Sequence, residues 1–156
     1  MSSESGHRFR DKDMRENKEP IGLGFGMTRQ RSAVLIAGPT ASGKSSLALA
    51  RAQERGGVIV NADSMQLYDT LRIVTARPSE ADEAQAEHRL YGTVPAAARF
   101  STGQWLTSVR AILEDIDPTR EVIFVGGTGL YFDALIKGFA DVPEIPPELT
   151  LAVQDE

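Results

Sequence analysis

The sequence predicts an α/β fold in which a parallel β-sheet is flanked by helices. Three apolar runs, at 33–37, 58–60 and 122–125, show no alternation with polar residues, which is typical of strands covered on both faces. Glycine-rich turns follow the first and third runs, and a helix-like segment comes directly after the first. A chain of 156 residues, 41% hydrophobic and 25% charged, fits one such domain.

The first apolar run leads into a phosphate-binding loop. The loop fits the pattern G-x-x-x-x-G-K-[ST] at every specified position, and its residues are Gly38, Pro39, Thr40, Ala41, Ser42, Gly43, Lys44 and Ser45. Its glycines let backbone N–H groups converge on phosphate oxygens, and the helix at 44–55 directs its positive N-terminal end to the same point. Lys44 would add a positive charge at the phosphate, and the Ser45 hydroxyl is placed to bind Mg²⁺. These features predict a P-loop NTPase-like sheet with an anion site.

A carboxylate follows the second apolar run, within the stretch NADSMQLY at 61–68. Ligands of open α/β sheets bind at the carboxyl ends of the strands, so Asp63 is expected beside the phosphate-binding loop. There it could bind Mg²⁺ or act as a base, whereas the plainer interpretation is a turn residue or helix cap. After the third run, Gly126 and Gly127 stand where many phosphate-loop nucleotidases carry an acidic residue. That argues against a hydrolytic motor and leaves Asp63 as the best carboxylate of the site.

Weaker signals indicate the remaining elements. Ser79 could cap a short exposed helix, and residues 89–94 read as a short strand ended by a proline. A capping box at Ser101 begins a helix that continues to 116 with one apolar face. The turn GGTGLY at 126–131 leads into a last helix that ends near 137. His88 is expected to be structural, because no second metal ligand lies at a suitable spacing.

Composition divides the chain into three parts. Residues 1–31 are polar and lack periodicity, so they are expected to be a disordered extension, with natural translation hypothesised to start at Met27. The α/β core covers 32–138, and the proline-containing tail at 139–156 adds no strand, which leaves the sheet incomplete at the C-terminus. The absence of cysteine and of long apolar runs favours a cytoplasmic protein without membrane contact. Residues 33–156 carry 17 acidic and 10 basic side chains, which argues against a large nucleic-acid-binding face on this part.

Six motifs together resemble the amino-terminal half of bacterial tRNA dimethylallyltransferases, also called tRNA isopentenyltransferases. The motifs are GPTASGKS at 38–45, NADSMQLY at 61–68, TARP at 75–78, HRLYG at 88–92, FSTGQW at 100–105 and VGGTGLYFDALIKG at 125–138. The resemblance covers about residues 33–148. It implies that a dimethylallyl group passes from dimethylallyl diphosphate to the N6 amine of the adenosine just 3′ of the anticodon, in tRNAs that read codons beginning with U.

The resemblance also implies roles for individual residues. Asp63 is the base that takes a proton from the amine, and Thr128 touches the reacting region from the neighbouring strand end. The loop at 38–45 contacts the donor, and Mg²⁺ is held partly by Ser45. Gln66 is able to hydrogen-bond the edge of the acceptor base. The residues implied to contact the tRNA are Asp63, Ser64, Met65, Gln66 and Thr128.

Two departures from the family bear on activity. Members continue for about as many residues again, and that part supplies a helical insertion that grips the anticodon stem and loop. A basic residue expected near position 150 is replaced by Thr150 and Leu151. We therefore expect a truncated monomer that lacks full activity, with the main tRNA-binding surface in the missing part and the start of that part in the tail at 139–156.

Three other functions stay open. An adenylate isopentenyltransferase, which makes cytokinin from free AMP or ADP, uses a similar loop, although DSMQ at 63–66 favours the tRNA enzyme. A P-loop small-molecule kinase would need an arginine-rich lid over the adenine, and the sequence shows no such segment. The third is an inactive fragment that binds diphosphate and catalyses no reaction.

Overall fold

A five-stranded sheet forms the centre of the molecule. The computed structural model describes residues 15–21, 31–70 and 72–138. The strands are β1 (Arg15–Ile21), β2 (Arg31–Ala37), β3 (Val58–Asn61), β4 (Glu87–Arg89) and β5 (Val122–Gly126), in the spatial order β1-β2-β5-β3-β4. Four of them, β2, β5, β3 and β4, pair in parallel, and β1 adds an antiparallel edge. The predicted parallel sheet is therefore confirmed.

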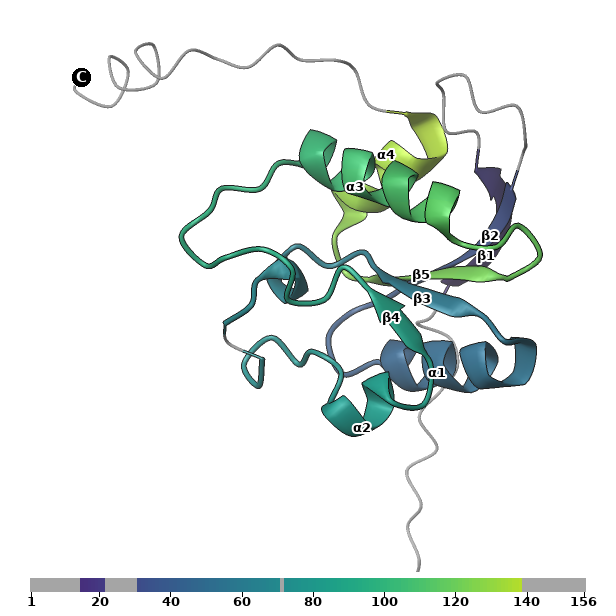
Figure 1. Ribbon diagram of the computed structural model, residues 1–156, viewed down its shortest axis with the longest axis horizontal. Helices are drawn as coiled ribbons and strands as arrows, with labels where there is room; N and C mark the ends of the chain where they lie inside the picture. The colour runs from purple at the N-terminus through teal and green to yellow at the C-terminus, as the bar shows by residue number, and fades with distance from the viewer. Residues whose placement is uncertain (1–14, 22–30, 71, 139–156) are drawn as a thin grey trace, which may run out of the picture.

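Helices cover the sheet on both faces. Helices α3 (Thr102–Asp115) and α4 (Gly129–Lys137) lie on one face, and α1 (Lys44–Arg55) and the short α2 (Glu80–Glu83) lie on the other (Figure 1). A turn of 3₁₀ helix, η2 (Met65–Leu67), follows β3. The connections through α1 and α3 return the chain to parallel strands, as an α/β sheet requires. The carboxyl ends of β2, β3 and β5 consequently meet at one edge of the sheet, where the site lies.

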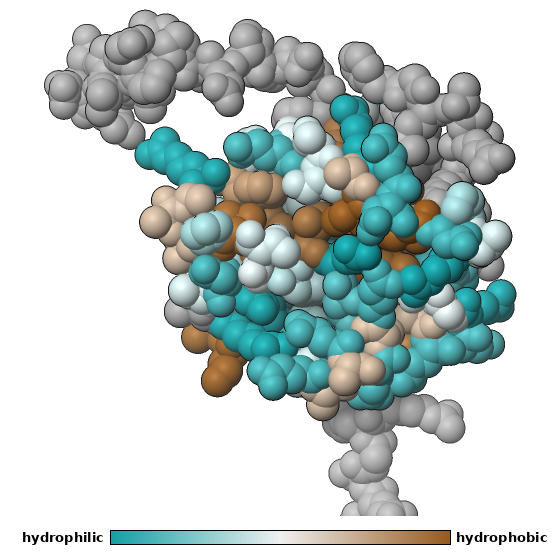
Figure 2. All heavy atoms as spheres, in the orientation of Figure 1, coloured by the Kyte–Doolittle hydropathy of each residue, from teal (hydrophilic) through white to brown (hydrophobic). Residues whose placement is uncertain are grey.

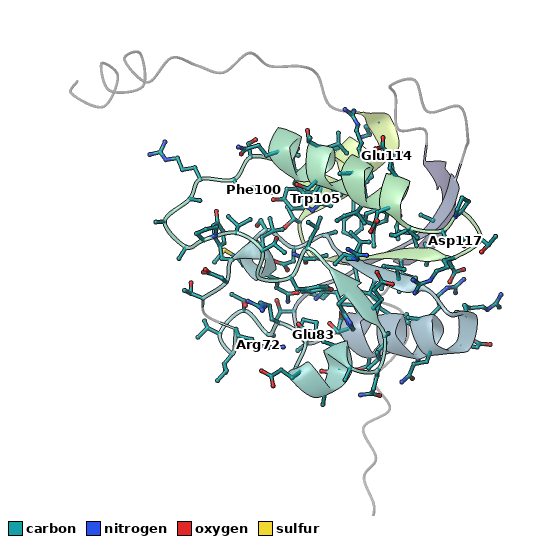
Figure 3. All side chains as sticks on the ribbon, in the orientation of Figure 1. Arg72, Glu83, Phe100, Trp105, Glu114 and Asp117 are labelled. Carbon is teal, nitrogen blue, oxygen red and sulfur yellow. The ribbon has the colours of Figure 1, made fainter. Side chains whose placement is uncertain are left out.

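The core has two hydrophobic layers, one on each face of the sheet. The larger layer lies under α3 and α4, and the fully buried Trp105 is its largest side chain. Its ring stacks on Tyr131, with the ring centroids 4.2 Å apart, and meets Phe124 edge-on. Trp105 itself is labelled in Figure 3. The smaller layer joins α1, through Ala48 and Ala52, to the other face of β2, β3 and β5. Both faces of the central strands are buried, which explains why their sequences show no polar alternation.

The structure differs from the sequence prediction at two places. Within the extension at 1–31, which was expected to be disordered, the segment Arg15–Ile21 pairs with β2 as strand β1. The strand expected at 89–94 is shorter and lies earlier, at Glu87–Arg89, and Val94 makes only an isolated bridge with Tyr68. Both are strands at or near the sheet edges, where pairing is decided by distant neighbours. The hypothesis about Met27 and the expectations for the tail at 139–156 fall outside the described residues.

Charged side chains link the amino ends of the strands, at the end of the sheet opposite the site. Arg120 donates to the Gly56 and Gly57 carbonyls at 3.0 and 3.1 Å and pairs with Glu87. Arg51 pairs with Glu121 at 2.7 Å. These residues join the starts of β3, β4 and β5 to one another. In the described part of the chain, no helix is both long and apolar enough to cross a membrane.

Candidate functional site

The phosphate-binding loop forms a tight turn between β2 and α1. Ala41 and Gly43 have positive φ values of 62° and 84°, and such a backbone conformation is unusual for a non-glycine residue and costs free energy. The turn is closed by a hydrogen bond from Ser42 N–H to the Pro39 carbonyl at 3.3 Å. Lys44 Nζ donates to the same carbonyl at 3.0 Å, which holds the ammonium group against the loop. The Ser42 hydroxyl is buried and has no hydrogen-bond partner in the described part of the chain.

Asp63 lies on a turn that a buried asparagine fixes. Asn61, the last residue of β3, is fully buried, and its Oδ1 accepts from Asp63 N–H at 2.9 Å. Its Nδ2 donates to the Asp63 carbonyl at 2.9 Å and to the Leu90 carbonyl at 3.0 Å. Trp105 Nε1 donates to the Asn61 carbonyl at 3.0 Å. The backbone that carries the Asp63 carboxylate is therefore anchored directly in the core.

Within the part of the chain that the structure describes, one oxygen of the Asp63 carboxylate accepts a hydrogen bond and the other accepts none. Its Oδ1 accepts from Met65 N–H at 3.0 Å, which is the turn interaction that the plainer interpretation of this residue predicts. Its Oδ2 lies near Gly127, where a side-chain Cβ would be 3.4 Å away. Asp63 thus has both roles available, because one oxygen stabilises the turn and the other remains for a ligand.

The end of β5 packs closely against this turn. A Cβ atom on Gly126 would lie 2.1 Å from the Ala62 carbonyl carbon and oxygen, so only glycine fits there. Thr128 N–H donates to the Ala62 carbonyl at 3.2 Å, and Thr128 Oγ1 accepts from Ser64 N–H at 2.9 Å. Thr128 therefore holds the Asp63 turn through the Ser64 backbone.

A pocket of about 390 Å³ joins the phosphate-binding loop to the Asp63 turn, a size typical of small-ligand sites. Of the predicted residues, the structure brings Asp63, Gln66 and the loop from Thr40 to Ser45 together there. Gly38, Pro39, Ser64, Met65 and Thr128 were also predicted to contact ligands but do not line it. The lining residues are Thr40, Ala41, Ser42, Gly43, Lys44, Ser45, Ser46, Asp63, Gln66, Thr75 and Ala76.

Three of the lining residues, Ser46, Thr75 and Ala76, were missed by the sequence reasoning. Thr75 and Ala76 come from the loop before α2, and both backbone carbonyls accept from Gln66 Nε2, at 2.8 and 3.2 Å. In the sequence, Thr75 and Ala76 were indicated only by the motif TARP, and that motif was used only for the family resemblance. Their position depends on a contact with Gln66 that no local pattern encodes.

Two tyrosines near the site are held in the neutral form. Burial raises the pKa of Tyr131 to about 12, with smaller contributions from the neighbouring Tyr68 and Asp63. Burial also raises the pKa of Tyr91 far above its ordinary range, with the charges of Asp63 and Glu83 adding to the effect. Neither phenol is suited to act as a base near neutral pH. Among the described residues that line the pocket, Asp63 is the one with a carboxylate.

The described residues contain no group of three or more His, Asp or Glu side chains that could hold a metal ion. His88 fits its predicted structural role, since its Nδ1 lies 2.8 Å from the Ala86 carbonyl and its ring meets Tyr91 edge-on. A divalent ion in the pocket would therefore need oxygen ligands from the bound molecule as well as from the protein.

Comparison with known proteins identifies the family. The family model described as IPP transferase matches residues 66–156, which is more than half of the chain. The chain belongs to the IPP transferase family. The matched part includes Gln66, Thr75 and Ala76 of the pocket and the β5 end that holds the Asp63 turn.

Curated relatives of the IPP transferase family are longer than this chain. A tRNA dimethylallyltransferase of Agrobacterium fabrum is 57% identical over 118 residues, which cover 75% of this chain and 40% of that protein. One from Allorhizobium ampelinum is 59% identical over 115 residues, 73% of this chain and 38% of that protein. The chain thus spans about 40% of the length of the curated relatives it matches.

Solved structures of the family share the fold. A tRNA delta(2)-isopentenylpyrophosphate transferase from Staphylococcus epidermidis has a TM-score of 0.62 at 29% identity, over 78% of this chain and 40% of that chain. A eukaryotic dimethylallyltransferase acting on tRNA has a TM-score of 0.65 at 27% identity, over 74% of this chain and 30% of that chain. The α/β core around the pocket therefore has the fold of the family's solved structures.

Proposed function

We propose that the pocket serves the transfer of a dimethylallyl group from dimethylallyl diphosphate to the N6 amine of the adenosine just 3′ of the anticodon, in tRNAs that read codons beginning with U. One observation carries the proposal: the Asp63 carboxylate and the phosphate-binding loop line the same pocket. The names of the relatives, tRNA dimethylallyltransferases, support this substrate class. The acceptor would place the activity in the cytoplasm.

The geometry suits a displacement at an allylic carbon. The amine nitrogen forms a bond to C1 of the dimethylallyl group while the C1–O bond breaks, and the bonding electrons leave with the diphosphate. The charge that develops on the diphosphate faces the loop N–H groups and Lys44, which stabilise it most when the bond is breaking. The proton lost by the amine goes to Asp63 Oδ2, since Oδ1 is held by Met65 N–H.

Magnesium fits this site through the ligand. The Ser45 hydroxyl is exposed at the start of α1 and lines the pocket, and hydroxyl and diphosphate oxygens are the hard ligands that Mg²⁺ prefers. Ser45 would hold the ion together with the donor, because the described residues offer no acidic cluster for it. When bound, Mg²⁺ would neutralise charge on the leaving diphosphate.

The proposal is tested with labelled dimethylallyl diphosphate. Donor binding is measured by calorimetry with this chain, and transfer is measured with tRNA, AMP and ATP in separate reactions, for this chain and the longer Agrobacterium fabrum relative. We expect the chain to bind the donor and label to enter tRNA alone. Label in AMP alone would instead assign an adenylate isopentenyltransferase, and absence of donor binding would contradict the proposal.

The role of Asp63 is tested by Asp63→Asn, which keeps an acceptor for Met65 N–H but cannot take a proton. We expect transfer to fall by at least about 100-fold, the usual contribution of a general base, while the donor dissociation constant changes by less than about twofold because the loop is untouched. The matched control is Asp69→Asn, an exposed residue outside the pocket. Near-normal transfer by Asp63→Asn would refute the base role.

A further inference from the structure

The two edges of the five-stranded sheet are blunted in different ways. At one edge lies β4, which is only three residues long and carries the charged residues Glu87 and Arg89. At the other edge lies β1, which is seven residues long and has the sequence RENKEPI (Figure 1). Short edge strands, and edge strands that contain charges and proline, keep a sheet edge from pairing with another chain. Both edges therefore have the features of protected edges.

The strand that β1 covers has the opposite character. The residues at 33–36 of β2 are at most 4% exposed. Ala33 and Leu35 belong to the hydrophobic layer under α3 and α4, whereas Val34 and Ile36 belong to the layer that joins α1 to the sheet. β2 thus has apolar side chains on both faces, as inner strands of parallel sheets do. Only the polar strand β1 separates it from the edge of the sheet.

The sequence of β1 indicates that it is attached to β2 mainly through the backbone. The antiparallel pairing is continuous over seven residues, from Arg15 opposite Ala37 to Ile21 opposite Arg31. Four residues of β1 are charged, and Pro20 has no N–H to donate. A segment of this composition contains little apolar surface that folding could bury. Displacement of β1 should therefore cost chiefly backbone hydrogen bonds and leave the core folded.

Without β1, the outer edge of β2 is complementary to itself. β5 pairs with the other side of β2, so the backbone groups of β2 that face β1 would lose their partners. This edge already accepts an antiparallel strand of seven residues. Two β2 strands related by a two-fold axis are antiparallel, and each supplies the donors and acceptors that the other needs. A second β2 also brings apolar side chains to both layers, which the polar β1 does not. The second copy is therefore the occupant that fits this edge.

We propose that β1 is an edge guard, defined by residues 15–21, which covers an interaction surface on β2 where two copies of this chain pair once β1 is displaced. The inference goes beyond the proposed function and does not depend on it, because the residues that line the pocket come from neither strand. A chain that began at Met27, the start hypothesised from the sequence, would lack β1 and would have this edge open. The association state of the protein would then depend on the residues before 27.

The test displaces β1 within the full chain. In an antiparallel pair, alternate residues exchange hydrogen bonds with the partner strand, so one of any two neighbours in β1 donates to β2. Asn17→Pro combined with Lys18→Pro removes that donor. The matched control, Asn17→Ala combined with Lys18→Ala, changes the charge equally and keeps both backbone N–H groups. Light scattering after size-exclusion chromatography should show monomers for wild type and the alanine control, and a mass that rises about twofold with concentration for the proline variant.

Two further measurements locate the contact and report on the fold. Hydrogen exchange of the ¹⁵N-labelled proline variant should be slow at the outward-facing β2 amides in the dimer and fast after dilution, whereas wild type should protect them at both concentrations. Trp105 is the single tryptophan of the chain, and its ring stacks on Tyr131 with the centroids 4.2 Å apart. Its fluorescence should be the same in wild type and in the proline variant, because the core stays folded.

An exposed apolar loop tip offers a competing explanation for any association. Ile73 and Val74 are 93% and 81% exposed, and they belong to the apolar surface at the lower left of Figure 2. Ile73→Ser combined with Val74→Ser, introduced into the proline variant, removes this surface and leaves β2 unchanged. The twofold rise in mass should persist in that variant. A return to the mass of one chain would assign the association to the loop tip and overturn the inference.

The remaining outcomes also decide the inference. A proline variant that stays monomeric with wild-type Trp105 fluorescence would show that the β2 edge does not pair with a second copy. Loss of that fluorescence would show that β1 is part of the fold and not a detachable guard. A dimer whose outward-facing β2 amides exchange freely would place the contact elsewhere. A wild-type chain that dimerises as the proline variant does would show that β1 guards nothing. Each of these results overturns the proposal.

Discussion

Two polar side chains of the phosphate-binding loop, those of Ser42 and Lys44, differ in their hydrogen bonding when no ligand is bound. The Ser42 hydroxyl is buried and has no partner in the described part of the chain, a state that destabilises the protein until an acceptor or donor arrives. Lys44 Nζ already donates to the Pro39 carbonyl at 3.0 Å. Binding of a diphosphate would therefore give the Ser42 hydroxyl a hydrogen-bond partner, whereas Lys44 would exchange a neutral acceptor for a charged one.

Lys44→Ala should weaken binding of dimethylallyl diphosphate by roughly 10- to 100-fold, because hydrogen bonds between charged groups contribute about 1.5 to 3 kcal/mol. Isothermal titration calorimetry measures the change directly. The control is Lys137→Ala, which removes the same charge from an exposed residue that pairs with Asp133 on α4. Equal losses in the two variants would mean that overall charge, and not the loop, binds the diphosphate.

At the scale of elements, the contact between the ends of β3 and β5 positions the site. A Cβ on Gly126 would lie 2.1 Å from the Ala62 carbonyl carbon and oxygen and 2.7 Å from Asp63 N. Gly126→Ala should therefore lower the free energy of unfolding by about 3 kcal/mol, at the upper end of the cost of overpacking. Gly129→Ala is the control, because its Cβ would meet no atom within 4 Å at the start of α4. Urea unfolding of the two variants measures the difference. Equal unfolding midpoints for Gly126→Ala and Gly129→Ala would show that the ends of β3 and β5 can move apart at little cost.

The amino ends of the strands make stability depend on pH. Arg120 and, more weakly, Arg89 lower the pKa of Glu87. A carboxylate with a lowered folded-state pKa stabilises the protein above its unfolded pKa of about 4.3, and that contribution is lost as pH falls through the folded value. Between pH 6 and pH 3, the free energy of unfolding should fall further in wild type than in Glu87→Gln. The difference should be about 1 kcal/mol or less, because solvent screens a partly exposed pair.

Urea midpoints at several pH values measure this difference. Glu114→Gln, at an exposed position of α3 (Figure 3), is the matched control and should follow the wild-type pH profile. Parallel profiles for wild type and Glu87→Gln would show that the Arg120 pair contributes nothing to folding.

At the scale of the whole molecule, the sequence predicted what local patterns encode. The phosphate-binding loop is one contiguous motif, α1 begins and ends at Lys44 and Arg55 as expected, and the apolar runs become the central strands. The position of Asp63 beside the loop also followed, because parallel strands end at one edge. Each of these predictions used residues close together in the chain.

The features that sequence reasoning missed depend on distant partners. Strand β1 has the polar sequence RENKEPI and is recognisable only through its pairing with β2. Asn61 resembles any strand-end residue until its hydrogen bond to the Leu90 carbonyl, 29 residues away, is seen. Thr75 and Ala76 line the pocket because their carbonyls accept hydrogen bonds from the Gln66 amide, which lies nine and ten residues earlier in the chain. Such contacts are tertiary, and no residue pattern along the chain predicts them.

Ligand binding and folding of the whole domain should be linked through the loop. A ligand that binds only the native state at 100 times its dissociation constant stabilises that state by about 2.7 kcal/mol, which for a domain of this size raises Tm by roughly 8 °C. We expect that rise with dimethylallyl diphosphate plus Mg²⁺, a smaller one with the donor after EDTA treatment, and none with Mg²⁺ alone. The described residues hold no acidic cluster for the ion by itself. Differential scanning calorimetry measures all three, with Lys44→Ala as the control that should show the smallest rise with the donor. A rise with Mg²⁺ alone would point to a metal site formed by the protein, and would contradict the assignment of the ion to Ser45 and the diphosphate.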